Sequence, residues 1–149
     1  MYPVIRMGLA AAVILAAQCV QAAPNAFRDP LDTPAREVMQ PLRAMMLGGE
    51  LLPGGQLIAV GRRGVVLRST DGGKAWNQSK VPLSTDLLAV SFIDDKQGWA
   101  VGHAGVVIHT SDGGVNWQRQ LDGRALPDLL IKHYTPAASA GDELAQRNL

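Results

Sequence analysis

The chain has 149 residues, which predicts one domain rather than two. Hydrophobic residues make up 47% and charged residues 18%, which excludes a disordered chain, and the net charge of +1 gives no electrostatic reason to expect a nucleic-acid partner. Sixteen Gly and nine Pro indicate frequent turns, which disfavours a helical bundle, and the single Cys excludes a disulfide scaffold.

The N-terminal segment, residues 1–22, has the pattern of a secretory signal peptide. Arg6 supplies a positive charge, residues 7–17 form an uncharged apolar run, and Val20-Gln21-Ala22 places small side chains before a cleavage site. The run is shorter than the ~18–20 residues that span a bilayer, so we expect cleavage and a periplasmic or secreted protein that is not itself transmembrane. A lipoprotein acylated at Cys19 is the alternative, although the residue before it is not small.

An N-terminal arm follows over residues 23–54, and its end holds a weak first strand that a Gly-Gly pair interrupts. The chain then repeats itself, because Gln56–Trp76 aligns with Gln97–Trp117 without a gap, with eleven of 21 positions identical. The period of this repeat, near 41, is typical of propeller blades, each a sheet of four short strands. We therefore predict an all-β fold, a partial β-propeller of two four-stranded blades over residues 55–121.

Apolar runs bounded by turn residues predict the individual strands. In the second blade these are Leu87–Ile93, Gly98–Val101, Val106–Thr110 and Asn116–Leu121. In the first blade they are Leu57–Val60, Val65–Ser69 and Ala75–Val81, preceded by the weak strand within Arg43–Leu52.

The turn between the third and fourth strands has the same pattern in both blades, [S/T]-x-D-x-G-x-x-W. Its residues are Ser69, Asp71, Gly73 and Trp76 in the first blade, and Thr110, Asp112, Gly114 and Trp117 in the second. A short Asp carboxylate accepts backbone N–H groups of its own turn, and Gly supplies a positive φ. We therefore interpret both Asp residues as structural turn carboxylates rather than catalytic groups or calcium ligands.

This turn resembles the Asp-box, or BNR repeat, of sialidase-like propellers. With the Val-Gly-x-x-Gly that precedes it, the arrangement is similar to the photosystem II stability/assembly factor family, over roughly residues 55–121. The resemblance implies an exported, non-catalytic scaffold that helps to assemble or stabilise a membrane-associated complex. Its partner would be a protein, and no cofactor is implied. A fragment of a sialidase-like glycoside hydrolase whose catalytic blades are absent is the alternative.

The repeat ends where residues 122–149 begin. A closed propeller needs about four to eight blades, and only two are present here. Residues 122–149 contain Pro127 and Pro136, so we expect an irregular insertion or tail with a helix only around residues 142–149. The economical interpretation is a truncated piece of a larger propeller, with self-assembly into a ring as the alternative.

Neither a catalytic group nor a metal site is expected. No Glu lies between Glu50 and Glu143 to form a glycosidase pair, and the three His residues lack metal-ligand spacing. Arg62, Arg63 and His103 are the candidate binding residues, because the turns after the second strand of each blade should share one end of the fold. Two adjacent Arg side chains there could hold a carboxylate or an acidic peptide segment.

Overall fold

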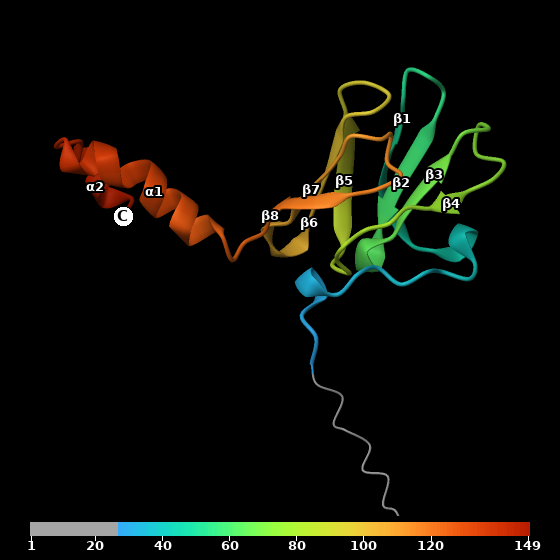
Figure 1. The fold of residues 1–149 in the computed structure, drawn as a ribbon, viewed down its shortest axis with the longest axis horizontal. Helices are drawn as coiled ribbons and strands as arrows, with labels where there is room; N and C mark the ends of the chain where they lie inside the picture. Colours follow the sequence, from blue (N-terminus) through green and yellow to red (C-terminus); the bar gives the residue numbers. More distant parts are fainter. Residues whose placement is uncertain (1–26) are drawn as a thin grey trace, which may run out of the picture.

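The computed structural model describes residues 27–149, which form two four-stranded antiparallel sheets followed by two helices (Figure 1). The predicted signal peptide lies outside the described residues. The first sheet contains β1 (Met46–Leu51), β2 (Leu57–Gly61), β3 (Val66–Ser69) and β4 (Asn77–Gln78). The second contains β5 (Leu87–Phe92), β6 (Gly98–Gly102), β7 (Val107–Thr110) and β8 (Gln118–Leu121). Each sheet is a meander in chain order, so the prediction of two four-stranded blades in a partial propeller is confirmed.

The two blades repeat one another residue by residue. Val60 pairs with Val66 in the first blade, and Val101 pairs with Val107 in the second, which is the same register one repeat later. An irregularity interrupts the pairing near the start of both innermost strands, β1 and β5. The sequence repeat is therefore a repeat of backbone geometry.

The fourth strand of the first blade is much shorter than predicted, because β4 contains two residues. Ser79 N still donates to Val66 O of β3 at 2.9 Å, but the backbone of the next residue, Lys80, bonds with the second blade. Lys80 N donates to Val115 O at 3.1 Å, and Trp117 N donates to Lys80 O at 3.0 Å. The Ser79 hydroxyl also donates to Gly114 O. The residues expected to lengthen this strand therefore connect the two blades.

The hydrophobic core lies between the facing sides of the two sheets. Successive strand residues point to opposite faces, so every second apolar residue of a strand enters this layer. Ile58, Val60 and Val66 enter it from the first blade, and Ala100, Ile108 and Trp117 from the second. Leu31 of the N-terminal arm closes the layer at one end.

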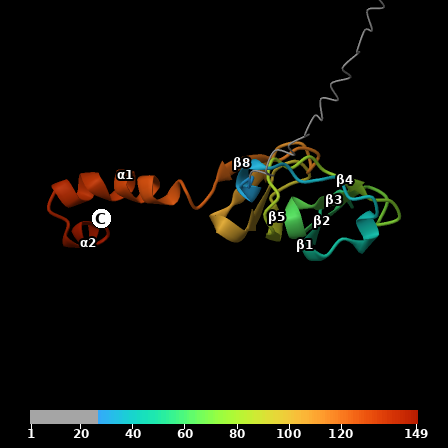
Figure 2. The same cartoon turned by 90° about the horizontal axis from the view of Figure 1, so that it is seen from below.

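The arm runs beneath the blades rather than away from them (Figures 1 and 2). Ser84 N donates to Pro30 O at 2.8 Å, and Ala35 N donates to Val81 O at 3.1 Å. The side chain of Gln78 bonds the arm twice more, accepting from Val38 N and donating to Arg36 O. The arm therefore continues the outer edge of the first blade before it enters β1.

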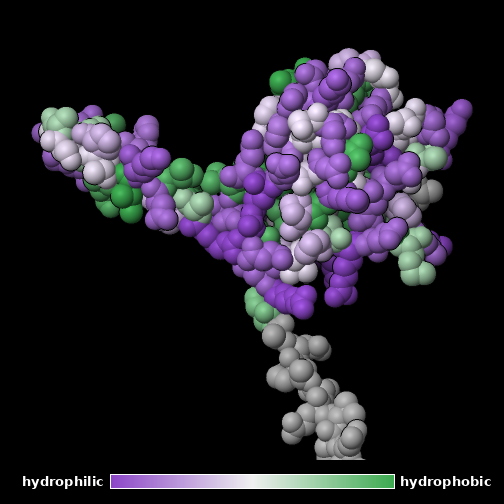
Figure 3. Space-filling view, in the orientation of Figure 1, coloured by the Kyte–Doolittle hydropathy of each residue, from purple (hydrophilic) through white to green (hydrophobic). Residues whose placement is uncertain are grey.

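The C-terminal segment is more helical than predicted. Instead of an irregular segment, α1 spans Leu126–Ser139, followed by α2 (Glu143–Arg147). Pro127 lies in the first turn of α1, where a missing N–H costs no helical hydrogen bond, and Pro136 lies only in its last turn. The two helices pack on each other and project from the sheets, and apolar side chains line their surface (Figures 1 and 3).

Candidate binding groove

The two Asp-containing turns have the same internal hydrogen bonds. Asp112 Oδ1 accepts from the Thr110 hydroxyl at 2.9 Å and from the N–H groups of Val115 and Asn116 at 3.1 and 2.9 Å. The Asn116 side chain donates to the other carboxylate oxygen at 2.7 Å. Asp71 accepts the equivalent bonds from Ser69 and from two N–H groups, all at 2.8–3.0 Å. Each carboxylate is therefore occupied by its own turn.

The remaining residues of the pattern complete each turn. Gly73 and Gly114 have φ of 87° and 80°, a conformation that a side chain would strain, and each N–H donates to the Ser or Thr hydroxyl. The indole N–H of Trp76 donates to Gly73 O at 3.0 Å, and that of Trp117 donates to Gly114 O at 3.2 Å. Trp117 is buried between the blades, whereas Trp76 is only partly buried.

Hydrogen bonding in the turns favours the ionised form of both Asp residues. The Ala75 N–H and then the Ser69 hydroxyl lower the pKa of Asp71. Burial opposes ionisation of Asp112, but the hydrogen bonds led by the Asn116 N–H outweigh it and lower its pKa as well. In both turns, the hydrogen-bond donors to the carboxylate come from the turn itself.

Arg62, Arg63 and His103 lie at the opposite end of the blades, in the turns after β2 and β6. Both turns contain a non-glycine residue in the left-handed region, Arg63 with φ of 55° and Ala104 with φ of 58°. The connecting segment between the blades links these turns through Asp86. Arg63 N donates to the Asp86 carboxylate at 2.9 Å, and His103 N donates to its backbone oxygen at 2.9 Å.

Two of the three candidate residues line a groove, which we call the arm groove. It encloses about 880 Å³ between the N-terminal arm, residues 30–45, and the turn after β2. Arg62 and Arg63 form one wall, and His103 is absent from the lining. The arm contributes two further arginines, Arg36 and Arg43, together with an apolar stretch that includes the exposed Met39 and Met45. No sequence pattern predicted this second wall.

Positive charge dominates the arm groove. Four arginines line it against one acidic residue, Glu37. Arg62 Nε lies 3.4 Å from Asp86 Oδ2, just outside the lining, so its charge is partly balanced within the protein. The Arg63 N–H and then the Arg62 guanidinium lower the pKa of Asp86. The arrangement suits an anionic ligand that also carries apolar groups, because charged and apolar walls face the same space.

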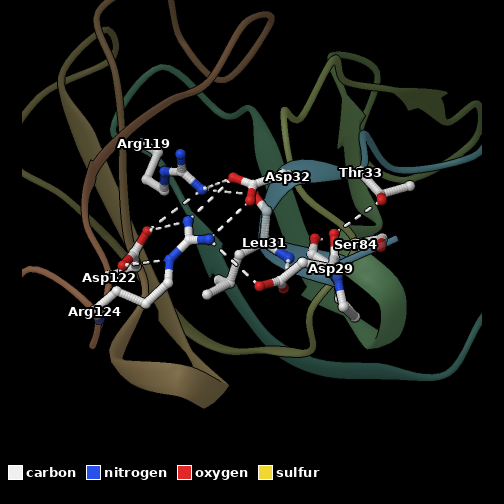
Figure 4. Close-up of polar contacts among 9 residues, drawn as sticks. Asp29, Leu31, Asp32, Thr33, Ser84, Arg119, Asp122 and Arg124 are labelled. Carbon is white, nitrogen blue, oxygen red and sulfur yellow. Dashed lines mark hydrogen bonds and ion pairs between the residues drawn. The ribbon is translucent and has the colours of Figure 1, made fainter. Parts of the chain in front are cut away.

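An ion cluster holds the arm that forms this groove (Figure 4). Arg124 contacts Asp32 at 2.7 Å, Asp122 at 2.9 Å and Asp29 at 3.3 Å. Arg119 also contacts Asp32, at 3.0 Å. The guanidinium groups of Arg124 and then Arg119 hold the pKa of Asp32 well below its usual range. This cluster joins the arm to the end of the second blade, and no local sequence pattern indicated it.

The described part of the chain holds neither a metal cluster nor a membrane-spanning helix. Among residues 27–149, no group of three or more His, Cys, Asp or Glu side chains is placed to hold a metal ion. No helix in the same range has the length and apolar character needed to cross a membrane.

Comparison with known proteins gives a family. The chloroplastic photosystem II stability/assembly factor HCF136 of Arabidopsis thaliana is 44% identical over 43 residues, or 28% of this chain and 11% of that protein. The solved structure "YCF48 bound to D1 peptide" is 30% identical with a TM-score of 0.46, and the match covers 53% of this chain and 26% of that one. The solved structure "YCF48 from Cyanidioschyzon merolae" is 26% identical with a TM-score of 0.46, and the match covers 58% of this chain and 29% of that one. The chain thus spans between 11% and 29% of the length of these relatives.

A sequence profile described as "Photosynthesis system II assembly factor YCF48" matches residues 54–134 of this chain. The matched range contains both blades from β2 onward and the first part of α1. The resemblance stated from the repeat and its turns is therefore confirmed. Because the profile covers more than half of the 149 residues, the chain belongs to the family of the photosynthesis system II assembly factor YCF48.

Proposed function

We propose that the protein is an exported, non-catalytic scaffold that helps a membrane-associated complex to assemble or remain stable. The family membership supports a role in assembly. The signal-peptide pattern of residues 1–22 supports export to the periplasm or secretion. In this role the protein needs a surface that binds a segment of a partner protein.

The arm groove is the surface that we assign to this task. One observation carries the assignment: four arginines and an apolar stretch line the same open space of about 880 Å³. Arginine binds carboxylates with two parallel hydrogen bonds, and the exposed Met39 and Met45 offer flexible apolar contacts. The partner segment would therefore be extended, acidic and partly apolar, as an unpaired end or loop of a membrane protein can be.

A peptide-binding measurement tests the assignment. The probe is a short fluorescent peptide of alternating glutamate and leucine, and a peptide with lysine in place of glutamate is the ligand control. The double substitution Arg36→Gln with Arg63→Gly removes one charge from each wall of the groove. Glycine is suitable at residue 63 because φ there is 55°. Arg147→Gln in α2 is a single-charge control, since it removes a positive charge from a residue outside the groove lining.

We expect the acidic peptide to bind the parent protein and the Arg147→Gln variant equally. The double variant should lose about tenfold in affinity, or 1.4 kcal/mol, and added salt should reduce the difference. The assignment would be contradicted if all three proteins bound the acidic peptide with equal affinity. It would also be contradicted if the parent protein bound the lysine peptide as tightly as the acidic peptide. Thermal unfolding of each variant separates lost affinity from lost stability.

A further inference from the structure

The methionines of the described chain are concentrated in one short stretch. Residues 27–149 contain no cysteine and three methionines, Met39, Met45 and Met46, at the end of the arm and the start of β1. Oxidation of sulfur side chains follows their exposure to solvent. A mild oxidant that reaches this part of the chain therefore finds its sulfur targets in one place, beside the arm groove.

Two of the three methionines line that groove, and the third does not. Met39 is 97% exposed and Met45 is 61% exposed in the described part of the chain, and both belong to the groove lining. Met46 is partly buried in β1, where it pairs with Gly61, and a Cβ placed on that glycine would lie 3.1 Å from the Met46 sulfur. The first two side chains are therefore open to a small oxidant, whereas the sulfur of the third packs against β2.

The exposed methionines alternate with arginines along the arm. Arg36, Met39, Arg43 and Met45 follow in this order, and all four line the groove. Met45 O also accepts from Arg62 N at 3.1 Å, which brings the apolar wall to the turn that carries the opposite arginines. A chemical change at either methionine therefore alters the immediate surroundings of the cationic groups.

Oxidation by a peroxide would change the character of the apolar wall. A sulfur lone pair attacks one oxygen of hydrogen peroxide, the O–O bond breaks, and the other oxygen leaves as water. The thioether is oxidised to a sulfoxide, and the peroxide is reduced by two electrons. A sulfoxide is polar and its oxygen accepts hydrogen bonds, so it loses the apolar contact and competes with a ligand carboxylate for the arginine N–H groups.

We propose that Met39 and Met45 form a modification site, at which oxidation by peroxide switches the arm groove to a weakly binding form. This switch rests on the proposed function, in which the arm groove is the binding surface. Methionine sulfoxide reductases return the sulfoxide to a thioether. In that reaction a dithiol is oxidised to a disulfide and the oxygen leaves as water, so the switch is reversible.

Peptide mapping by mass spectrometry tests the modification itself. The folded protein is treated with graded amounts of hydrogen peroxide, catalase stops the reaction, and fragment ions of the digested protein give the sulfoxide content of each methionine. We expect Met39 and Met45 to be oxidised several-fold faster than Met46, and all three to react alike in urea. Equal rates for the three methionines in the folded protein would overturn the proposal.

Binding of the fluorescent peptide of glutamate and leucine, which contains no methionine, tests the switch. Peroxide treatment should lower the affinity of the parent protein about fivefold, because apolar contact is lost, and the reductases with a dithiol should restore it. The double variant Met39→Leu with Met45→Leu keeps an apolar wall without sulfur, so it should bind like the untreated parent before and after peroxide. Met46→Leu is the matched control and should stay as sensitive to peroxide as the parent.

The results distinguish a failure of the switch from a failure of the proposed function. If the untreated parent does not bind the peptide, the proposed function is contradicted and the switch with it. If the untreated and treated parent proteins bind equally well, only the switch is overturned. A double leucine variant that remains as sensitive to peroxide as the parent would also overturn the switch.

A second double variant separates the loss of binding from damage to the fold. Met39→Gln with Met45→Gln places polar side chains at both positions without an oxidant, and it should bind as weakly as the treated parent. If peroxide changes the circular dichroism spectrum of the parent, this variant decides the outcome. Parent-like affinity of the folded glutamine variant would then overturn the proposal.

Discussion

Replacing Asp112 by Ala should destabilise the blades more than the equivalent change at Asp71. Asp112→Ala removes the acceptor of two backbone N–H groups, the Thr110 hydroxyl and the Asn116 side chain. Hydrogen bonds to a charged group contribute about 1.5–3 kcal/mol each when buried, but this carboxylate is exposed and water can reach the freed donors. We therefore expect a loss of about 2–3 kcal/mol for the whole set.

Asp71→Ala is the internal control, because the first turn lacks the side-chain bond that Asn116 makes and Trp76 is less buried than Trp117. For a domain of this size each kcal/mol lowers Tm by about 3–5 °C, so Asp112→Ala should lower it by roughly 6–15 °C. Thermal unfolding followed by circular dichroism measures both variants. A smaller loss for Asp112→Ala than for Asp71→Ala, or no loss for either, would refute the reasoning.

Four further results are expected. Trp117→Ala should lower the free energy of unfolding by about 3–5 kcal/mol and Trp76→Ala by clearly less, measured by urea unfolding, because only the first residue is buried between the blades. Since its guanidinium partners lower the pKa of Asp32, the stability from the ion cluster should be complete above about pH 4–5 and fall as the pH drops below the unfolded value of about 3.9, measured by thermal unfolding across that range. Arg124→Gln should speed tryptic cleavage within the arm several-fold, seen by mass spectrometry, and unchanged cleavage would show that the cluster does not hold it. N-terminal sequencing of exported protein should begin at or near Ala23, whereas a chain that retains residue 1 would contradict cleavage.

The strands were predictable because their signals are local. Apolar runs, glycine turns and the constant spacing between the two copies are all visible in the sequence itself, and most strand limits agree with the structure to within about one or two residues. β4 was the exception, because Lys80 bonds with the neighbouring blade, and that choice depends on tertiary contact. α1 was missed because Pro127 and Pro136 were interpreted as helix breakers, although both lie in terminal turns.

The groove was predictable only in part. Arg62 and Arg63 were placed at the correct end, because meander geometry fixes which turns share an end. The wall that the arm forms was not predicted. The contact between Asp32 and Arg124 that holds the arm joins residues 92 positions apart and has no counterpart in the repeat. His103 was grouped with the arginines because it lies in the equivalent turn, but the arm groove is lined by the arm and the turn after β2, and His103 is not part of that lining.

The passage of residues 79–81 from the first sheet to the second has a consequence for hydrogen exchange. The backbone of Lys80 forms hydrogen bonds with Val115 and with Trp117, the two neighbours of Asn116. These bonds connect the turn of the second blade to the outer edge of the first. Opening that turn breaks the hydrogen bonds of both Lys80 and Trp117 at once, so neither blade opens there alone. The amides of Lys80 and Trp117 should therefore show equal protection factors under native conditions, and both factors should fall together when Asp112 is replaced.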